Sequence, residues 1–177
     1  MKTKTDTLRI VKEIDVELEA PAKVVFPLLC PVKEVDWIDG WEDVCTIVYT
    51  ASGIAEEACV FETDIPLEGK SLWICSRYDA ENTQIEYIKH LFGKAVIKWR
   101  MSVCDLPGGR SVIRSRYIAT SLTPEGRAYV QKLDEKGVRE LLEGLQGRVN
   151  YYVTNGKMKR NLVEKAACHV HAHHTAK

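Results

Sequence analysis

The chain has 177 residues, of which 45% are hydrophobic and 28% charged, and its 25 Lys and Arg residues balance 25 Asp and Glu residues. This length suits one domain with a substantial core. The zero net charge and the scattered basic residues argue against a nucleic-acid partner, which would require a basic face. No apolar run of about 18 residues occurs, so we expect no stable membrane insertion. The N-terminal residues lack the apolar core of a signal peptide, and we therefore predict a cytoplasmic protein.

The six cysteines show no pairing motif. None forms a C-x-x-C pair, and most lie within apolar runs such as VCTIVY and ACVF. Disulfides belong to oxidising compartments, so we predict reduced thiols that act as small buried hydrophobic groups. The cysteines are Cys30, Cys45, Cys59, Cys75, Cys104 and Cys168.

The first predicted elements are a strand and two short helices. In residues 8–18, Ile10, Ile14 and Val16 alternate with acidic residues, which indicates a half-buried strand. Pro21 suits the first position of a short helix. Further prolines at positions 27 and 31 limit this helix and lead to a second short segment through residues 35–37.

From residue 42 onward, six short runs are rich in β-branched and aromatic residues. Turn-forming sequences such as ASG, LEG, AEN and LPGG separate them. Regular spacing with tight turns predicts a meander of antiparallel strands joined as consecutive hairpins. The predicted strands span residues 42–50, 56–64, 70–79, 83–90, 94–105 and 110–122. With the first strand, the sheet has seven.

After Thr123 the spacing of the apolar residues becomes helical. Thr123 is a predicted N-cap, and Pro124 follows at the first helical position. Apolar residues then recur every three or four positions to residue 153, which predicts one helix of about eight turns. Three glycines within it each cost about 1 kcal/mol relative to alanine. Close approach to the sheet, space left for a ligand, or a kink would explain Gly137, Gly144 and Gly147.

These elements predict an α+β fold in which a curved seven-stranded antiparallel sheet wraps on a long C-terminal helix. Strongly twisted sheets of this size curl, and the helix carries the apolar stripe that covers the concave face. We expect one domain over residues 1–163. Residues 164–177 form a His-rich tail that we expect to be disordered, as chain termini often are.

Four motifs carry a resemblance to known proteins: DWIDGW after the short helices, EEACVFETD and SLWICSRYD in strands, and YIATSLTPEG before the last helix. With this order of elements, residues 8–158 resemble the helix-grip superfamily. That group includes START-like lipid-transfer domains, polyketide cyclase-like proteins and plant pathogenesis-related proteins, often pooled as SRPBCC proteins. The resemblance implies a deep, mostly apolar cavity between sheet and helix, in which members bind or transform hydrophobic small molecules. The fold alone does not indicate whether a protein of this kind is an enzyme or a binding protein.

Alternation along the strands predicts which residues face this cavity. Trp99 and Met101 share the inward face of one strand, as do Ser115 and Tyr117 on the next and Tyr87 on a third. Alternation alone leaves the aromatic residues at positions 61 and 73 undecided. Large apolar surfaces with a few hydroxyls are typical of a small-molecule pocket, although they also suit a filled core. The predicted ligand-binding residues are Trp37, Trp41, Phe61, Trp73, Tyr87, Trp99, Met101, Ser115, Tyr117, Leu141 and Leu145.

Two of these residues, Trp37 and Trp41, flank Gly40 in an acidic loop. In this architecture the loop lies over one end of the sheet. The two indoles therefore either form the rim of the cavity or anchor the short helices to the sheet without a ligand. We predict the rim.

The sequence contains few candidate catalytic groups. It has no G-x-S-x-G elbow, Gly-rich phosphate loop or H-E-x-x-H motif. Glu62 and Asp64 would serve as acid–base groups if they faced the cavity, but charges on a strand are more often solvated. His90 lies at a strand end, where we expect it to be solvated. Tyr87 or Tyr117 would be able to donate a hydrogen bond to a carbonyl or enolate oxygen.

The tail contains soft and borderline metal ligands. Their position past the last helix favours adventitious binding or no role, so we predict neither a metal site nor a cofactor. The tail residues are Cys168, His169, His171, His173 and His174.

Two function classes follow, beside a third in which the chain is an interaction module whose pocket is filled by its own side chains. The first is a carrier or sensor that binds a hydrophobic small molecule of lipid, polyketide or aromatic type. The second is a cyclase- or dehydratase-like enzyme that acts on a polyketide or aromatic substrate in the same cavity, which would require Tyr117, Glu62 or His90 to converge inside it. The sequence leaves the oligomeric state open between monomer and homodimer.

Overall fold

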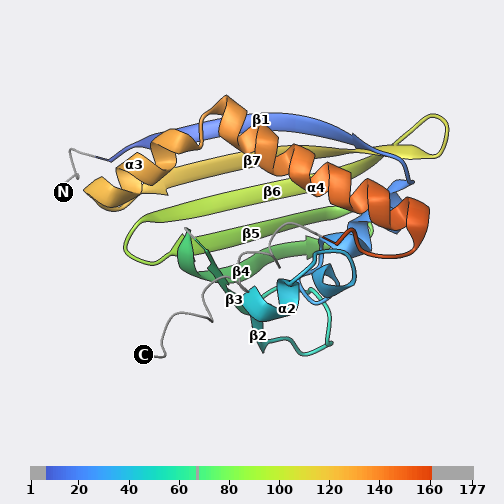
Figure 1. The fold of residues 1–177 in the computed structure, drawn as a ribbon, viewed down its shortest axis with the longest axis horizontal. Coiled ribbons are helices and arrows are strands. Elements are labelled where there is room, and N and C mark those ends of the chain that lie inside the picture. Colours follow the sequence, from blue (N-terminus) through green and yellow to red (C-terminus); the bar gives the residue numbers. More distant parts are fainter. Residues whose placement is uncertain (1–6, 67, 161–177) are drawn as a thin grey trace, which may run out of the picture.

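The computed structural model describes residues 7–66 and 68–160. Seven strands form one antiparallel sheet in the order β1-β7-β6-β5-β4-β3-β2 (Figure 1). The six strands after β1 follow one another as hairpins, as predicted. The strands are β1 (Arg9–Leu18), β2 (Cys45–Tyr49), β3 (Val60–Ile65), β4 (Gly69–Asp79), β5 (Gln84–Leu91), β6 (Ala95–Leu106) and β7 (Arg110–Ser121).

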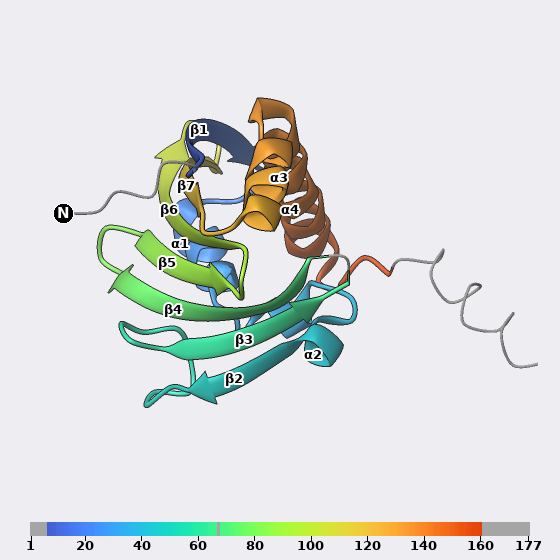
Figure 2. The ribbon, with the colours of Figure 1, turned by 90° about the vertical axis from the view of Figure 1, so that its left-hand side faces the viewer.

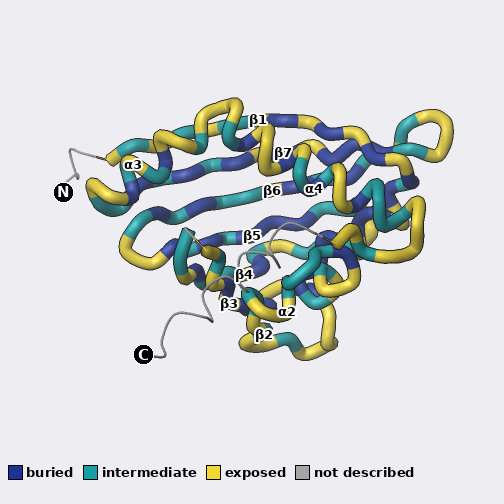
Figure 3. The backbone as a smooth tube through the Cα atoms, viewed as in Figure 1, coloured by how far each residue is buried: buried dark blue, intermediate teal, exposed yellow. Residues whose placement is uncertain are grey.

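The alternation predicted for the central strands is confirmed. On β6, Ile97, Met101 and Val103 are buried. On β7, Ser115 and Tyr117 are buried while Arg114 and Arg116 are exposed. Figure 3 shows the same alternation along β5, β6 and β7. Successive side chains of a strand point to opposite faces, so one face of the sheet carries the core.

Four short helical turns connect β1 to β2. They are α1 (Ala22–Val25), the 3-10 turns η1 (Phe26–Leu29) and η2 (Glu34–Asp36), and α2 (Trp41–Val44). Two short helices were predicted here, and residues 42–44 were wrongly assigned to the following strand. Glu42 and Asp43 lie in the first turn of α2, where acidic side chains favour the helix terminus.

The C-terminal helical region is two helices, α3 (Pro124–Lys132) and α4 (Glu135–Asn155), so the prediction of one unbroken helix was wrong. Thr123 caps α3 as predicted, since its hydroxyl accepts a hydrogen bond from Gly126 N at 3.1 Å. Asp134 starts α4 in the same way by accepting from Gly137 N at 2.9 Å. The new cap allows the apolar period to continue while the backbone changes direction.

The glycines of this region have different roles. A Cβ at Gly137 would lie 2.3 Å from Lys132 O, so the kink explains this glycine. A Cβ at Gly147 would contact nothing within 4 Å, and one at Gly144 would only meet the tip of a flexible side chain at 3.7 Å. Close approach to the sheet therefore does not explain these two glycines.

The helices cover the concave side of the curved sheet, as Figure 2 shows. α4 contacts β1, while α3 contacts β7 and β6. A Cβ at Gly126 of α3 would lie 1.7 Å from Lys94 O, so this glycine permits the close approach of helix and sheet. The architecture is the predicted α+β sheet gripping a long C-terminal helix.

The five cysteines within the described residues are free. Cys30, Cys59 and Cys75 are buried, as predicted, whereas Cys45 and Cys104 are partly exposed. Cys168 lies outside the described residues, as does the rest of the predicted tail at 164–177. Among the helices of the described chain, none is both long enough and apolar enough to cross a membrane.

Candidate ligand-binding cavity

A cavity of about 190 Å³ lies between the concave face of the sheet, helix α4 and the segment with η2 and α2. Ten of the eleven predicted ligand-binding residues line it, so the structure brings them together; ligand binding itself stays a prediction. The ten are Trp37, Trp41, Phe61, Trp73, Tyr87, Trp99, Met101, Tyr117, Leu141 and Leu145.

Ser115 is the predicted residue that does not line the cavity. It faces the interior, as alternation requires, but its Oγ accepts a hydrogen bond from Trp99 Nε1 at 2.8 Å. The large indole thus lies between the small hydroxyl and the hollow. Ser115 orients Trp99 and contributes no surface of its own.

All four tryptophans of the chain line the cavity, and each indole N–H donates to a protein acceptor. Trp37 Nε1 donates to Leu28 O at 3.0 Å, and Trp41 Nε1 donates to Pro31 O at 2.7 Å. Trp73, which alternation left undecided, donates from Nε1 to Thr63 Oγ1 at 2.9 Å. Both Trp37 and Trp41 line the cavity, and their hydrogen bonds run to the segment of the short helices and not to the sheet; the rim assignment stays a prediction.

The aromatic wall is held by ring contacts as well. Phe61 stacks on Trp73 with centroids 5.4 Å apart, and Tyr87 meets both rings edge-on at 5.7 and 6.1 Å. Trp99 and Tyr117 form a further edge contact at 5.7 Å. Such pairs stabilise one arrangement of the side chains. The wall is thereby organised without a ligand.

A buried ion pair lies in the lining and was missed at the sequence level. Lys89 is 4% exposed, and its Nζ lies 2.5 Å from Glu68 Oε1 and 4.7 Å from the ring centroid of Trp73. The Tyr129 hydroxyl donates to the same Glu68 oxygen at 2.5 Å. Burial lowers the pKa of Lys89, and the Glu68 carboxylate opposes that shift. Lys89 shares the strand parity of Tyr87, which was the signal for its inward direction.

Glu34 of η2 also lines the cavity and was not predicted. The residue as a whole is partly exposed, it faces a cavity whose lining is mostly apolar, and burial raises the pKa of its carboxyl group to about 8. Within the described residues, no hydrogen bond or ion pair involves this carboxyl group. Burial, and to a smaller extent the charge of Glu34, raise the pKa of Tyr87, whose hydroxyl donates to Leu29 O at 2.9 Å.

Two exposed residues mark the mouth of the cavity on α4. Leu141 is 40% exposed, and Arg148, one turn beyond Leu145, is also exposed. Among the described residues, Arg148 has no ion pair. Its guanidinium therefore places a positive charge at the entrance.

The other candidate catalytic groups lie elsewhere. Glu62 and Asp64 are exposed on β3, as expected for charges on a strand. His90 lies on the opposite face of β5 from Lys89, and its ring contacts Phe92 at 5.0 Å. In residues 7–66 and 68–160 no group of three or more His, Cys, Asp or Glu side chains is placed to hold a metal ion. The Cys and His residues of the tail lie outside these ranges.

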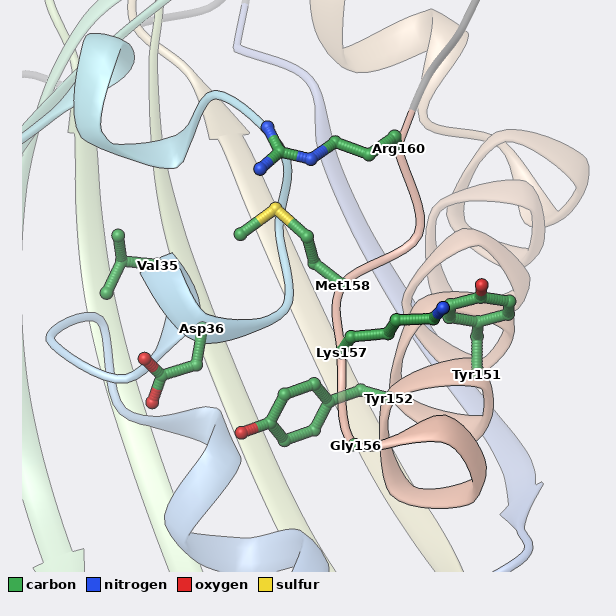
Figure 4. A pocket seen from close by; sticks show the side chains of 8 residues that line it. All are labelled: Val35, Asp36, Tyr151, Tyr152, Gly156, Lys157, Met158 and Arg160. Atoms are coloured by element: carbon green, nitrogen blue, oxygen red, sulfur yellow. The ribbon is translucent and has the colours of Figure 1, made fainter.

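A second hollow of about 700 Å³ lies on the other side of the η2 segment (Figure 4). It is wide and open to solvent, and η2 faces the end of α4 and the segment after it across this hollow. An ion pair between Arg160 Nη1 and Asp39 Oδ1, 3.1 Å long, spans the same region. Because its walls are mostly solvated, it is a weaker candidate for binding a hydrophobic molecule. Its lining residues are Val35, Asp36, Tyr151, Tyr152, Gly156, Lys157, Met158 and Arg160.

Solved structures share this architecture. Norcoclaurine synthase from Thalictrum flavum, in complex with dopamine and hydroxybenzaldehyde, matches with a TM-score of 0.65 at 16% identity over 90% of this chain and 97% of that one. The Zhui aromatase/cyclase from Streptomyces sp. R1128 matches with a TM-score of 0.59 at 15% identity, over 84% of this chain and 98% of that one. A START superfamily protein from Mycobacterium smegmatis matches with a TM-score of 0.56 at 17% identity, over 80% and 97% respectively.

These matches show that the chain has the helix-grip fold of the SRPBCC and START-like proteins, and the resemblance found in the sequence is confirmed at the level of fold. No protein-family model matches the sequence, and no curated protein matches it. The fold is shared with a START superfamily protein and with an aromatase/cyclase.

Proposed function

We propose that this protein binds a small hydrophobic molecule of one or two aromatic rings in the cavity between the sheet and α4, as a carrier or sensor. The observation that carries the proposal is a hollow walled by all four tryptophans of the chain. The solved structure of norcoclaurine synthase, with its two single-ring compounds, supports a ligand of this kind.

The size of the cavity favours an aromatic ligand over a lipid or a polyketide. Pockets for drug-sized ligands measure about 300–1,000 Å³, whereas this cavity measures about 190 Å³. An apolar cavity of about 150 Å³ accommodates benzene. An acyl chain or a folded polyketide would require the walls to move apart, against the ring contacts and indole hydrogen bonds that hold them.

A carrier or sensor is favoured because the Tyr87 hydroxyl and the indole N–H groups of the aromatic wall already have protein partners. Tyr87 and the four tryptophans all donate to protein acceptors. The acid–base groups that the sequence suggested, Glu62 and His90, do not enter the cavity.

One observation supports the enzymatic alternative. Glu34 and Lys89 line the same cavity, and burial shifts the pKa of each toward neutrality. Carboxyl and amino groups whose pKa values are shifted inside a cavity are candidate acid–base catalysts. A cyclase- or dehydratase-like reaction on an aromatic substrate is the second candidate. Recovery of a co-purified compound unchanged after prolonged incubation would count against it.

The binding proposal is tested by native mass spectrometry of freshly purified protein and by calorimetric titration with cumene, a single-ring hydrocarbon. Leu141→Trp enlarges an exposed side chain at the mouth, so it should weaken binding at least tenfold with little change in stability. Val48→Trp introduces the same side chain at a position that is 55% exposed on β2, away from the cavity, and is the matched control. Absence of both a co-purified compound and cumene binding, or equal binding by the two variants, would refute the proposal.

A further inference from the structure

The polar groups of the cavity indicate what the ligand carries besides its ring. Glu34 lines the cavity from η2, and no described residue pairs with its carboxyl group. An isolated carboxylate among apolar side chains is strongly disfavoured, so such a group takes up a proton. As a neutral acid, Glu34 presents one O–H donor to the hollow.

Several titratable groups face Glu34 from the neighbouring elements. Among them, Glu34 itself is the group that we expect to ionise near neutral pH. Burial raises the pKa of Cys45 on β2 to about 12 and raises that of Tyr87 on β5 well above its ordinary value. Lys89 of β5 pairs with Glu68, and burial lowers its pKa in spite of that partner. Arg148 of α4 lies at the exposed mouth.

The balance of charge disfavours a cationic ligand. With Glu34 neutral, the charged lining residues are Lys89, Arg148 and Glu68, which sum to one positive charge. An organic ammonium would meet Arg148 at the mouth and Lys89 inside. An oxygen acceptor, in contrast, would meet donors at each of these positions.

The indole groups cannot serve a polar ligand, because their N–H groups donate to Leu28, Pro31, Thr63 and Ser115. Glu34 is therefore a neutral donor of the wall without an acceptor among the described residues, whereas the Tyr117 hydroxyl, which also lines the cavity, interacts with the hydroxyl of Tyr129. A hydrogen bond that a bound ligand fails to make would leave this donor buried and unsatisfied, which disfavours pure hydrocarbons.

We infer that the cavity selects aromatic ligands that carry an oxygen acceptor of the carbonyl class, and that Glu34 donates the hydrogen bond that selects them. This inference rests on the proposed function and assigns the chemical class of its ligand. An aromatic amine paired with an ionised Glu34 is the competing outcome.

Three probes of the same size and branching separate these outcomes. Acetophenone carries a carbonyl group, cumene replaces it with a methine and methyl, and 1-phenylethylamine carries a cation. Calorimetric titration near pH 6.5 should show acetophenone binding about tenfold more tightly than cumene, the effect of one hydrogen bond, and the amine binding most weakly. Near pH 9.5 the ratio of acetophenone to cumene affinity should fall toward one, because an ionised Glu34 no longer donates.

Two substitutions test the role of Glu34 itself. Glu34→Gln keeps an N–H donor but has no titrating proton, so the preference for acetophenone should persist at both pH values. Glu34→Leu removes the donor, so the preference should be lost at both, with thermal unfolding showing that each variant is folded. An undiminished preference in Glu34→Leu, or tighter binding of the amine by the wild type, would overturn the inference.

The same titrations distinguish this inference from the function on which it rests. If cumene and acetophenone bind equally well to the wild type at both pH values, the ligand class assigned here is wrong while the cavity still binds aromatic rings. If none of the three probes binds, the proposed function fails and the inference fails with it.

Discussion

The neutral state of Glu34 makes a prediction about stability that needs no ligand. The pKa of its carboxyl group rises from an ordinary value of 4.5 to about 8 in the folded protein because burial disfavours the charged form. The perturbation is Glu34→Gln, which keeps the size and polarity of the side chain and removes its ionisation. The quantity of interest is the difference in free energy of unfolding between wild type and variant as the pH changes.

The sign follows from the protons bound. Between pH 4.5 and about 8 the folded state keeps a proton on Glu34 that the unfolded state has lost. Stability therefore falls as pH rises through this window, by at most about 1.4 kcal/mol per pH unit. The stabilisation is complete below the unfolded pKa and is lost as the pH passes the folded pKa. From pH 5 to pH 8 the wild type should lose up to about 4 kcal/mol relative to Glu34→Gln, and less where water enters through the mouth of the cavity.

Urea denaturation of both proteins at unit steps from about pH 5 to pH 9 measures this difference. The slopes of the unfolding free energy against urea should agree, since the substitution changes little buried surface. Other ionising groups contribute equally to both proteins and cancel in the difference. A difference that stays constant within about 0.5 kcal/mol over this range would show that Glu34 ionises like a solvated carboxyl. The assigned ligand class would then lose its donor.

Four further predictions concern the stability of the fold. Lys89→Met should cost about 2–3 kcal/mol of stability, because it leaves the Glu68 carboxylate buried without its partner. Adding Glu68→Gln to this variant should restore part of the lost stability. A chemical denaturation experiment in which Lys89→Met is as stable as the wild type would contradict this. Gly126→Ala should cost about 3 kcal/mol or more, because its Cβ would lie 1.7 Å from a backbone oxygen. Gly147→Ala should instead stabilise the protein by about 1 kcal/mol and raise its unfolding midpoint, because the new Cβ would contact nothing within 4 Å. Asp134→Ala removes the cap of α4 and should cost about 1 kcal/mol in the same assay, with a smaller loss in Asp134→Asn.

The strands were predictable because buried and exposed residues alternate along each half-buried strand. In β7 the exposed residues Arg114 and Arg116 alternate with the buried residues Ser115 and Tyr117, and that pattern alone fixes which face meets the helix. The break between α3 and α4 was not predictable from the apolar period, because the period continues across it. The local signal was Asp134 three residues before Gly137, a cap followed by a glycine within an apparently continuous helix.

The aromatic wall followed from alternation and fold, but its charged groups did not. Lys89 lies at an inward position of β5, yet a lysine at a strand end suggests a solvated side chain. Its burial depends on Glu68, which is 21 residues away in the turn before β4 and has no sequence relation to it. The inward position of Glu34 was even harder to predict from the sequence. The 3-10 turn η2 has too few residues to show a period, so no pattern indicates which way the Glu34 side chain points.

The persistence of the hollow is itself a physical problem, and its solution links stability to binding. An empty cavity of about 190 Å³ destabilises a protein by about 4–5 kcal/mol when its walls do not collapse, which is a large part of a typical folding free energy. The walls here resist collapse because each indole is fixed twice, by its packing and by an N–H bond to a defined acceptor; Trp37 and Trp41, for example, are bonded to Leu28 O and Pro31 O. A ring that fills the space recovers contacts which the protein cannot make alone. Filling the cavity restores the stabilisation that the empty space costs the folded protein, and this gain contributes to the binding free energy. The gain is largest for an aromatic ligand whose size matches the cavity.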